Sequence, residues 1–361
     1  DIIVRVMNTR VWRIGVDIGG TFTDFVLLDE TSGDLHKFKI PSTPRAPEDA
    51  VLEGMSRVST DVADSVSIVH GSTVATNALL QRTGARTALV TTSGFRDVLT
   101  IGRQNREHIY DLFSDRTPPL IPPVDCYEIN ERVDCHGNVL QSIIENEICA
   151  LKADLIKQKF EAVAVSLLFS FLCPKHEQRV ASTLRAAGFL VSLSSEIAPE
   201  FREYERASTT AINAYVTPVL SGYLGRLESE LSETGFDFRI MQSNGGSIGA
   251  SRARAQAVRS ILSGPAGGVV GAAYVAREVG IRQFITFDMG GTSTDVSLYQ
   301  GNIQVTSEAK VGGLPIRIPV IDIHTVGAGG GSIAQIDEGG ALRVGPRSAG
   351  SDPGPACYGR G

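Results

Sequence analysis

Residues 14–28 read IGVDIGGTFTDFVLL, and residues 285–298 read ITFDMGGTSTDVSL. In each stretch an apolar run ends in an aspartate, two glycines and a threonine follow, and a second aspartate comes seven residues after the first. A strand, a tight glycine turn and a return strand would produce this pattern. The same pattern in two places indicates an internal duplication rather than two unrelated turns.

The repeat extends beyond the turn itself. Strands are predicted over 12–18, 24–29 and 34–40 around the first copy, and over QFITFDM, DVSLYQ and NIQVTSEA around the second. A helix over 47–59 follows the first meander. Strands and helices then alternate through SIVH, ARTALVTT, EAVAVSLLFSF and GFLVSLSSE. This order predicts an α/β protein with a mixed sheet covered by helices on both faces.

The pattern divides the chain into two domains, 11–198 and 199–361. Residues 115–146 interrupt the alternation with the Pro-rich stretch DRTPPLIPPVD and the turn HGN, and we expect them to form an inserted hairpin. The second domain is predicted to begin with a helical region over 199–233. The strand DFRIMQS and the small-residue helix SGPAGGVVGAAYVAREVG then lead into the second copy of the repeat.

Composition excludes several classes of protein. The net charge is -6 and the pI about 5.6, with no basic run, which argues against nucleic-acid binding. The five cysteines form no CxxC pair and fit no zinc pattern, so we expect a reduced, cytoplasmic protein. The longest apolar stretch, 162–173, is too short to cross a membrane and is interpreted as a buried strand.

The residue types of the repeated turn suit phosphate chemistry. Glycine amides with neighbouring threonine hydroxyls can form an anion-binding nest, which here would comprise Gly19, Gly20, Thr21 and Thr23 in one copy and Gly290, Gly291, Thr292 and Thr294 in the other. Asp17 and Asp288 could hold magnesium, with Asp24 and Asp295 in support. The alternative is a plain tight hairpin with Asp and Thr as turn residues.

Other motifs for phosphate or catalysis are absent from the sequence or out of context. No Gly-Lys pair occurs, which excludes a P-loop, and neither GxSxG nor HExxH is present. The GxGxxA match within 327–334 is followed by a strand-like rather than a helical sequence. Among the six histidines, His70 and His324 remain candidates because an apolar strand meets a glycine-rich turn at each.

The two DxGGTxTD hairpins resemble the phosphate-1 and phosphate-2 loops of the actin, hexokinase and heat-shock-chaperone ATPase superfamily. SGPAGGVVGAA resembles its connecting helix, and VGAGGGS its adenosine motif, which would assign Gly327, Gly329, Gly330 and Gly331 to the nucleotide. The resemblance implies duplicated ribonuclease-H-like domains that bind ATP and Mg²⁺ between them, with room for a further divalent metal.

A longer series of motifs, RIGVDIGGTFTD, HGSTVATNALL, TTSGFRDVLTIGRQ, PEFREYERASTT, MQSNGG, FDMGGTSTDVSL and RVGPRSAGSDPGPACYGRG, is similar to the hydantoinase A and 5-oxoprolinase family. That family includes acetone carboxylase β subunits. The resemblance implies ATP-dependent phosphorylation and opening of a hydantoin, 5-oxoproline or related lactam, in an oligomer with a B-type partner subunit. Members are usually longer, so we expect this chain to be an N-terminal portion.

Two other functions stay open: an ATP-dependent ketone carboxylase subunit and a non-catalytic ATPase switch. The segment TTSGFRDVLTIGRQNREHIYDLF gathers charged residues after a strand, as a small-substrate pocket would, although a solvated helix face is the alternative. REYER at 202–206 could likewise be functional or only surface charge. The substrate candidates are His70, Thr73, Arg96, Asp97, Arg103, Asn244 and His324.

Overall fold

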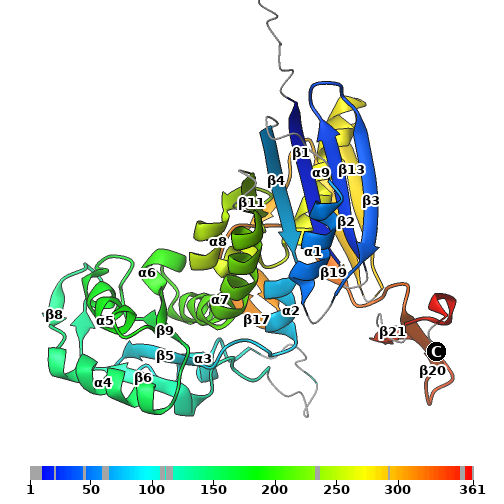
Figure 1. Cartoon of the computed structure of the whole chain (residues 1–361). Helices are drawn as coiled ribbons and strands as arrows, with labels where there is room; N and C mark the ends of the chain where they lie inside the picture. The colour runs from blue at the N-terminus through cyan, green and yellow to red at the C-terminus, as the bar shows by residue number, and fades with distance from the viewer. Residues whose placement is uncertain are drawn as a thin grey trace, which may run out of the picture.

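The computed structural model describes residues 10–19, 22–43, 46–58, 65–105, 110, 117–231, 236–291, 293–349 and 354–359. It is a mixed α/β structure in which a long helix, α7 (Glu203–Leu231), runs between two sheets (Figure 1). The duplicated α/β architecture predicted from the sequence is confirmed. In both copies the strands pair in the same register, Asp17 opposite Asp24 and Asp288 opposite Asp295.

The first copy lies in a six-stranded sheet of order β12-β11-β4-β1-β2-β3. Its strands are β1 (Val11–Ile18), β2 (Phe22–Asp29), β3 (Leu35–Pro41), β4 (Ser65–Ser72), β11 (Asp237–Met241) and β12 (Ser247–Gly249). Alternate residues of β1 and β2 are buried, as expected for a sheet with one covered face. Helix α1 (Pro47–Ser56) packs on this face so closely that a Cβ at Gly54 would lie 1.9 Å from Phe25.

A second sheet has the order β10-β9-β5-β6 and is parallel throughout. It consists of β5 (Thr87–Thr92), β6 (Cys126–Ile129), β9 (Ala162–Ser166) and β10 (Leu190–Leu193). Helices α4 (Glu145–Lys157) and α5 (Lys175–Arg185) lie beside it, with α7 on its other side (Figure 1). Every residue of β5 and β9 is buried, which explains their continuous apolar sequences.

These sheets correct three expectations. The single mixed sheet is instead two sheets. Within the predicted hairpin region, β6 joins the parallel sheet next to β5, where Cys126 and Ile129 are buried. Only β7 (Arg132–Val133) and β8 (Val139–Gln141) pair as a hairpin. The apolar stretch 162–173 is a strand only as far as Ser166, and turns follow. The α4 helix was not anticipated, and residues 115–116 lie outside the described residues.

The second copy forms a three-stranded sheet of β13 (Gln283–Met289), β14 (Thr294–Gln300) and β19 (His324–Val326). The expected third strand, NIQVTSEA, is wrong. After a turn at Gly301, Ile303 makes one isolated bridge to Tyr299, and β15 (Val305–Thr306) pairs with β18 (Val320–Ile321). Further pairs are β16 (Ala309–Val311) with β17 (Leu314–Ile316), and β20 (Ser332–Ile336) with β21 (Leu342–Ser348).

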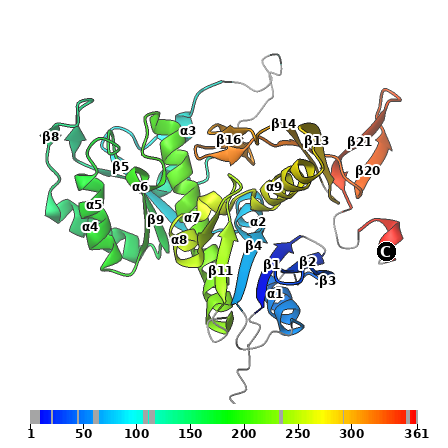
Figure 2. The same ribbon diagram turned by 90° about the horizontal axis from the view of Figure 1, so that it is seen from above.

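Helix α9 (Ser263–Glu278) connects the two copies. It contacts both β4 and β13, and Figure 2 shows it between the β1–β2–β3 meander and the β13–β14 pair. The remaining helices are α2 (Val74–Leu80), α3 (Val98–Ile101), α6 (Ser194–Ile197) and α8 (Ala250–Ala255), with 3₁₀ turns at Pro123–Asp125, Ala257–Ser260 and Ala356–Tyr358. No helix in the described ranges has the length and apolarity needed to span a bilayer.

The domain boundary at residue 198 stays a prediction. Strand β11 lies after it in sequence but pairs in parallel with β4 of the six-stranded sheet. Two segments of the predicted second domain, β11 and β12, therefore belong to the first sheet.

Candidate active site

The two glycine hairpins have the same turn geometry. The Gly19 amide donates to the Phe22 carbonyl at 3.0 Å, and the Gly290 amide donates to the Ser293 carbonyl at 2.9 Å. These two amides close the turns and are not free to bind an anion. The donors for phosphate would have to come from the residues that follow, of which Gly291 is described, whereas Gly20, Thr21 and Thr292 lie outside the described residues.

Buried threonines hold the hairpins in place. The Thr23 hydroxyl is 3.0 Å from the Ser42 hydroxyl, which in turn donates to the Gly19 carbonyl at 2.8 Å. In the second copy, the Thr294 hydroxyl donates to the Ala328 carbonyl at 2.6 Å. Both threonines therefore hydrogen-bond to neighbouring protein groups, which makes them supports of the loops in this geometry.

Asp17 lies where the two copies meet. Its side chain is exposed on the face of β1 that α1 does not cover, but two glycines lie close to its carboxylate. A Cβ added to Gly71 would lie 2.9 Å from Oδ1 of Asp17, and a Cβ added to Gly264 would lie 3.5 Å from the same oxygen. Loss of hydration in these surroundings raises the pKa of Asp17 to about 6, and the negative charges of Asp24 and Asp288 add to this effect. The Asp288 contribution indicates that this carboxylate, from the second copy of the repeat, is near enough to affect the charge of Asp17.

Asp295, the second aspartate of the second copy, is oriented by a hydrogen bond from β19. The Thr325 hydroxyl on β19 donates to Oδ1 of Asp295 at 2.6 Å. Within the described ranges, no three His, Cys, Asp or Glu side chains converge into a complete metal site. Magnesium, however, needs only one or two protein carboxylates when waters and phosphate oxygens complete its shell. Asp17 and Asp288 are compatible with that kind of site.

The glycine run 327–331 lies directly on the second hairpin. The Gly330 amide donates to the Gly290 carbonyl at 2.9 Å, and the Gly331 amide to the Gly291 carbonyl at 2.7 Å. At Gly329 a Cβ would lie 2.6 Å from the Gly290 carbonyl oxygen, so a side chain cannot be accommodated without movement. Gly327 is exposed at the start of this run. The run and the hairpin thus form one unit.

Three groups near Asp17 were not anticipated from the sequence. Gly71 lies opposite Asp17 in the parallel β1–β4 pairing. Gly264 and Ser263 lie at the start of α9, where the Ser263 hydroxyl donates to the Ser72 carbonyl at 3.2 Å. The only sequence signals were glycines in HGST and SGPAGG, whose nearness to Asp17 depends on long-range pairing. Thr73, a predicted substrate residue, bonds the Ile18 carbonyl at 3.2 Å, close to the first hairpin.

His70 occupies the core rather than an open surface. It is fully buried, with Nδ1 3.2 Å from the Val16 carbonyl and Nε2 2.5 Å from the Tyr223 hydroxyl. Burial lowers the pKa of His70 to about 4, so the imidazole is neutral at physiological pH. This geometry favours a structural role.

The other substrate candidates are dispersed. Arg96 donates to the Pro123 carbonyl at 2.9 Å, and Asp97 is exposed at the start of α3. The side-chain Oδ1 of Asn244 accepts from the Gly246 amide, and His324 is exposed on β19. In the described part of the chain, none of these four side chains bonds Asp17, Asp24 or Asp288. They stay predictions.

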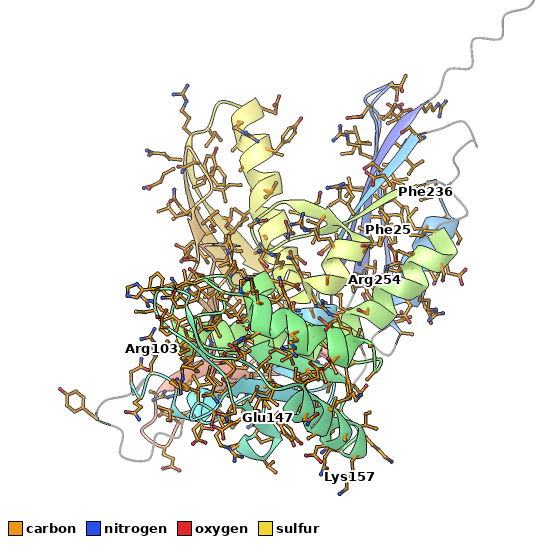
Figure 3. All side chains as sticks on the ribbon, turned by 90° about the vertical axis from the view of Figure 1, so that its left-hand side faces the viewer. Phe25, Arg103, Glu147, Lys157, Phe236 and Arg254 are labelled. Atoms are coloured by element: carbon orange, nitrogen blue, oxygen red, sulfur yellow. The ribbon has the colours of Figure 1, made fainter. Side chains whose placement is uncertain are left out.

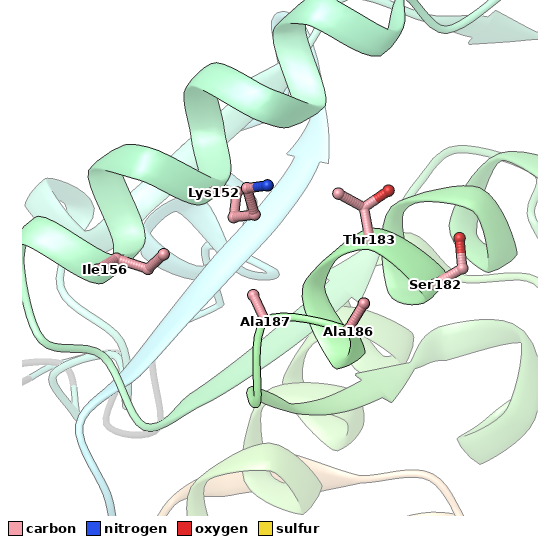
Figure 4. A pocket seen from close by; sticks show the side chains of 6 residues that line it. All are labelled: Lys152, Ile156, Ser182, Thr183, Ala186 and Ala187. Carbon is pink, nitrogen blue, oxygen red and sulfur yellow. The ribbon is translucent and has the colours of Figure 1, made fainter.

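Arg103 lies well apart from Phe25, a residue of β2 next to the first hairpin, as Figure 3 shows. It makes a bidentate ion pair with Glu205, at 2.6 and 2.9 Å. It also lines a cavity of about 390 Å³ with Phe169, Phe171 and Phe201. Another cavity, of about 550 Å³, lies between α4 and α5 and is lined by Lys152, Ile156, Ser182, Thr183, Ala186 and Ala187 (Figure 4). No predicted site residue lines that second cavity.

Two family models together match most of the chain. The hydantoinase/oxoprolinase N-terminal region model matches residues 13–188, and the hydantoinase/oxoprolinase model matches residues 206–361. Caprolactamase subunit alpha from Pseudomonas jessenii is 38% identical over 98% of this chain and 53% of its own length.

Two solved structures share the fold. ATP-dependent caprolactamase from Pseudomonas jessenii superposes with a TM-score of 0.81 at 37% identity, and nucleotide-free acetone carboxylase with 0.79 at 28% identity. They match 96% and 95% of this chain, respectively, and 52% of their own chains. The chain thus spans about half the length of these relatives. On the two family models and these likenesses together, the chain belongs to the hydantoinase/oxoprolinase family.

Proposed function

We propose that this chain is the ATP-binding part of an enzyme that phosphorylates and opens a cyclic amide. One observation carries the proposal: Asp17 and Asp288, at matching positions of duplicated glycine hairpins, are close enough to interact electrostatically. Two carboxylates that face each other repel unless a cation lies between them. A hydrated magnesium ion bound to a triphosphate would supply that charge.

The described residues have distinct parts in such a site. Asp17 and Asp288 would hold the magnesium ion, and Asp24 and the oriented Asp295 would support them. The Gly291 amide, with Gly20, Thr21 and Thr292 as predicted from the sequence, would bind phosphate oxygens. The glycine run 327–331, fixed to the second hairpin by Gly330 and Gly331, would accommodate the nucleoside. ATP supplies the phosphoryl group that makes a poor electrophile reactive.

The chemistry can be written with all atoms accounted for. The carbonyl oxygen of the cyclic amide attacks the γ-phosphorus, and the bond from phosphorus to the ADP oxygen breaks. Water then attacks the activated carbon, and the carbon–nitrogen bond breaks as the amine takes up a proton, which opens the ring and leaves an acyl phosphate. A second water attacks the same carbon, and inorganic phosphate leaves with the original carbonyl oxygen. Because the protein provides no covalent partner in this scheme, its contribution is positioning and charge stabilisation.

The likeness to caprolactamase, whose name denotes a cyclic amide substrate, supports a hydantoin, 5-oxoproline or another lactam as the class of substrate for this protein. The likeness to acetone carboxylase supports a second candidate, ATP-dependent carboxylation of a ketone. A relative named as a subunit supports a hetero-oligomer, and we propose a B-type partner. The five free cysteines are compatible with a cytoplasmic location.

Isotope transfer tests the reaction. The full-length protein with its partner would be given a lactam labelled with ¹⁸O at its carbonyl, together with ATP, and the released phosphate analysed by mass spectrometry. We expect one labelled oxygen in phosphate for each ring opened. Ring opening with unlabelled phosphate would contradict O-phosphorylation, and a carboxylated product formed only with bicarbonate would establish the ketone carboxylase instead.

A further inference from the structure

The first copy of the repeat carries a cation in line with its two aspartates. Asp17 of β1 lies directly opposite Asp24 of β2, which in turn lies directly opposite Lys39 of β3. Residues directly opposite one another in antiparallel strands lie on the same face of the sheet. Phe38 and Ile40, the chain neighbours of Lys39, pack into the core on the other face. Lys39 is exposed, so its side chain shares the open face with both carboxylates.

The second copy has a neutral residue at the matching position. There, Asp288 lies opposite Asp295, which lies opposite Thr325 of β19. The Thr325 hydroxyl donates to Asp295 at 2.6 Å. In the described strand pairings, Lys39 is therefore the only cationic residue directly opposite an aspartate of the repeat. The two halves of the proposed site thus differ in charge.

The ammonium group of Lys39 is accessible to a ligand beside the first hairpin. In the described part of the chain it forms no ion pair with Asp24 and lies 4.6 Å from the centre of the Phe22 ring. Phe22 is the first residue of β2, and its carbonyl accepts the Gly19 amide that closes the hairpin. A contact between an exposed cation and an aromatic ring is weaker than a charge-assisted hydrogen bond to phosphate, so a phosphate group would displace it.

The other parts of the proposed site indicate which phosphate would reach Lys39. The glycine run 327–331 is fixed to the second hairpin by Gly330 and Gly331 and would hold the nucleoside on that side. A triphosphate that extends from there toward the first hairpin brings its terminal phosphate nearest to β1, β2 and β3. Carboxylates and a triphosphate in one site carry more negative charge than one magnesium ion neutralises. A lysine, with a compact charge on a flexible stem, is suited to offset that excess.

We propose that Lys39 binds the terminal phosphate of ATP and stabilises the charge on it during transfer to the cyclic amide. This inference rests on the proposed function, because it requires ATP between the hairpins. The bonds formed and broken are those already described, and Lys39 forms none of them. Lys37 provides the contrast, because it is exposed on the same face of β3 but lies opposite Val26 rather than an aspartate.

Calorimetry on the full-length protein, with Mg²⁺ and either ADP or the non-hydrolysable β,γ-imido analogue of ATP, tests the contact. Lys39→Met should weaken binding of the analogue at least about tenfold and leave the affinity for ADP within about twofold, because ADP lacks the terminal phosphate. Lys37→Met should change neither affinity. If wild type binds the analogue and the two variants match it, the role of Lys39 is refuted and the proposed function stands. If wild type binds neither nucleotide, both proposals fail.

Turnover separates a charged contact from a structural one. With partner subunit, lactam and ATP, Lys39→Met should lower kcat at least about a hundredfold, and Lys39→Arg, which keeps the charge, should remain at least about tenfold more active than Lys39→Met. All three variants should melt within about 2 °C of wild type, because the replaced side chains are exposed. Equal losses in Lys39→Arg and Lys39→Met would overturn the proposal, as would equal losses in Lys37→Met and Lys39→Met. An exposed lysine on an edge strand, present only to deter pairing with other chains, would give the second of these results.

Discussion

The carboxylate of Asp288 raises the pKa of Asp17, although the two residues belong to different copies of the repeat. Each lies one residue before the end of the first strand of its hairpin, at the position opposite a second aspartate. The fold therefore brings like charges together where helix α9 joins the two copies. Without a cation between them, these like charges weaken the folded state, and the proposed magnesium ion would remove that repulsion.

Loss of either carboxylate should affect turnover far more than stability. We expect Asp17→Asn and Asp288→Asn in the full-length enzyme each to lower kcat by at least about a hundredfold, because the charge acts on the phosphoryl-transfer transition state. Steady-state kinetics measures this loss. Asp237→Asn, which changes an exposed carboxylate at the start of β11, is the control and should be neutral. Near-normal turnover in Asp288→Asn would refute the assignment.

The elevated pKa of Asp17 predicts a specific dependence of stability on pH. Its folded-state pKa of about 6 lies above the unfolded value of 3.8, so ionised Asp17 opposes folding. The penalty is absent below pH 4 and complete above pH 6. With allowance for solvent screening, Asp17→Asn without ligand should be more stable than wild type by about 1 kcal/mol at pH 7 and equal to it at pH 4. Denaturant unfolding measures both proteins at both pH values. If the prediction is wrong, the difference in unfolding free energy between variant and wild type will be the same at pH 7 and pH 4.

His70 predicts the opposite slope. The unfolded chain protonates this imidazole below pH 6.5, whereas the folded protein resists protonation until about pH 4. Stability is therefore lost as pH falls through this window, by up to about 3 kcal/mol. In His70→Gln that loss should disappear, so the free-energy difference between wild type and variant should change by about this amount between pH 7 and pH 4. A constant difference would show that His70 does not titrate as described.

The packing of Gly329 on the second hairpin predicts a selective effect on nucleotide binding. A methyl group there would press on the Gly290 carbonyl and displace one element from the other. Gly329→Ala should weaken MgATP binding at least about tenfold by calorimetry, whereas Gly271→Ala, in open space on α9, should not change it. Equal affinities for the two variants would argue that the glycine run takes no part in binding.

The local features of the fold could be predicted from the sequence because they depend on short-range rules. The hairpins follow from Asp-x-Gly-Gly-Thr and its flanking alternation. Helices were also predicted where α7 and α9 lie, although α7 contains Pro218 and α9 contains Pro265 and several glycines. The union of β6 with β5 could not be predicted, because parallel neighbours are distant in sequence and Cys126–Ile129 alone does not identify its partner. The third strand of the second meander was wrongly predicted because β19, which pairs antiparallel with β14, is distant from it in sequence.

The site was predictable to the extent that it lies in the repeat. Gly71 and Gly264 lie in motifs that the sequence shows, HGST and SGPAGG, but they approach Asp17 only through the parallel β1–β4 pairing and the arrival of α9, which local sequence does not reveal. His70 was a candidate because it precedes a glycine turn. Side-chain alternation along β4, however, directs it into the core beside Tyr223.

Hydrogen exchange with MgATP tests the central claim, that one nucleotide is held by both hairpins. The full-length protein would be compared with and without MgATP, with adenosine as a control that lacks phosphates. We predict slower exchange in the peptides that contain residues 13–24 and 285–295 together, at the same MgATP concentration, and no such change at 13–24 with adenosine. Protection of only one hairpin, or of neither while ATP is bound, would contradict the account.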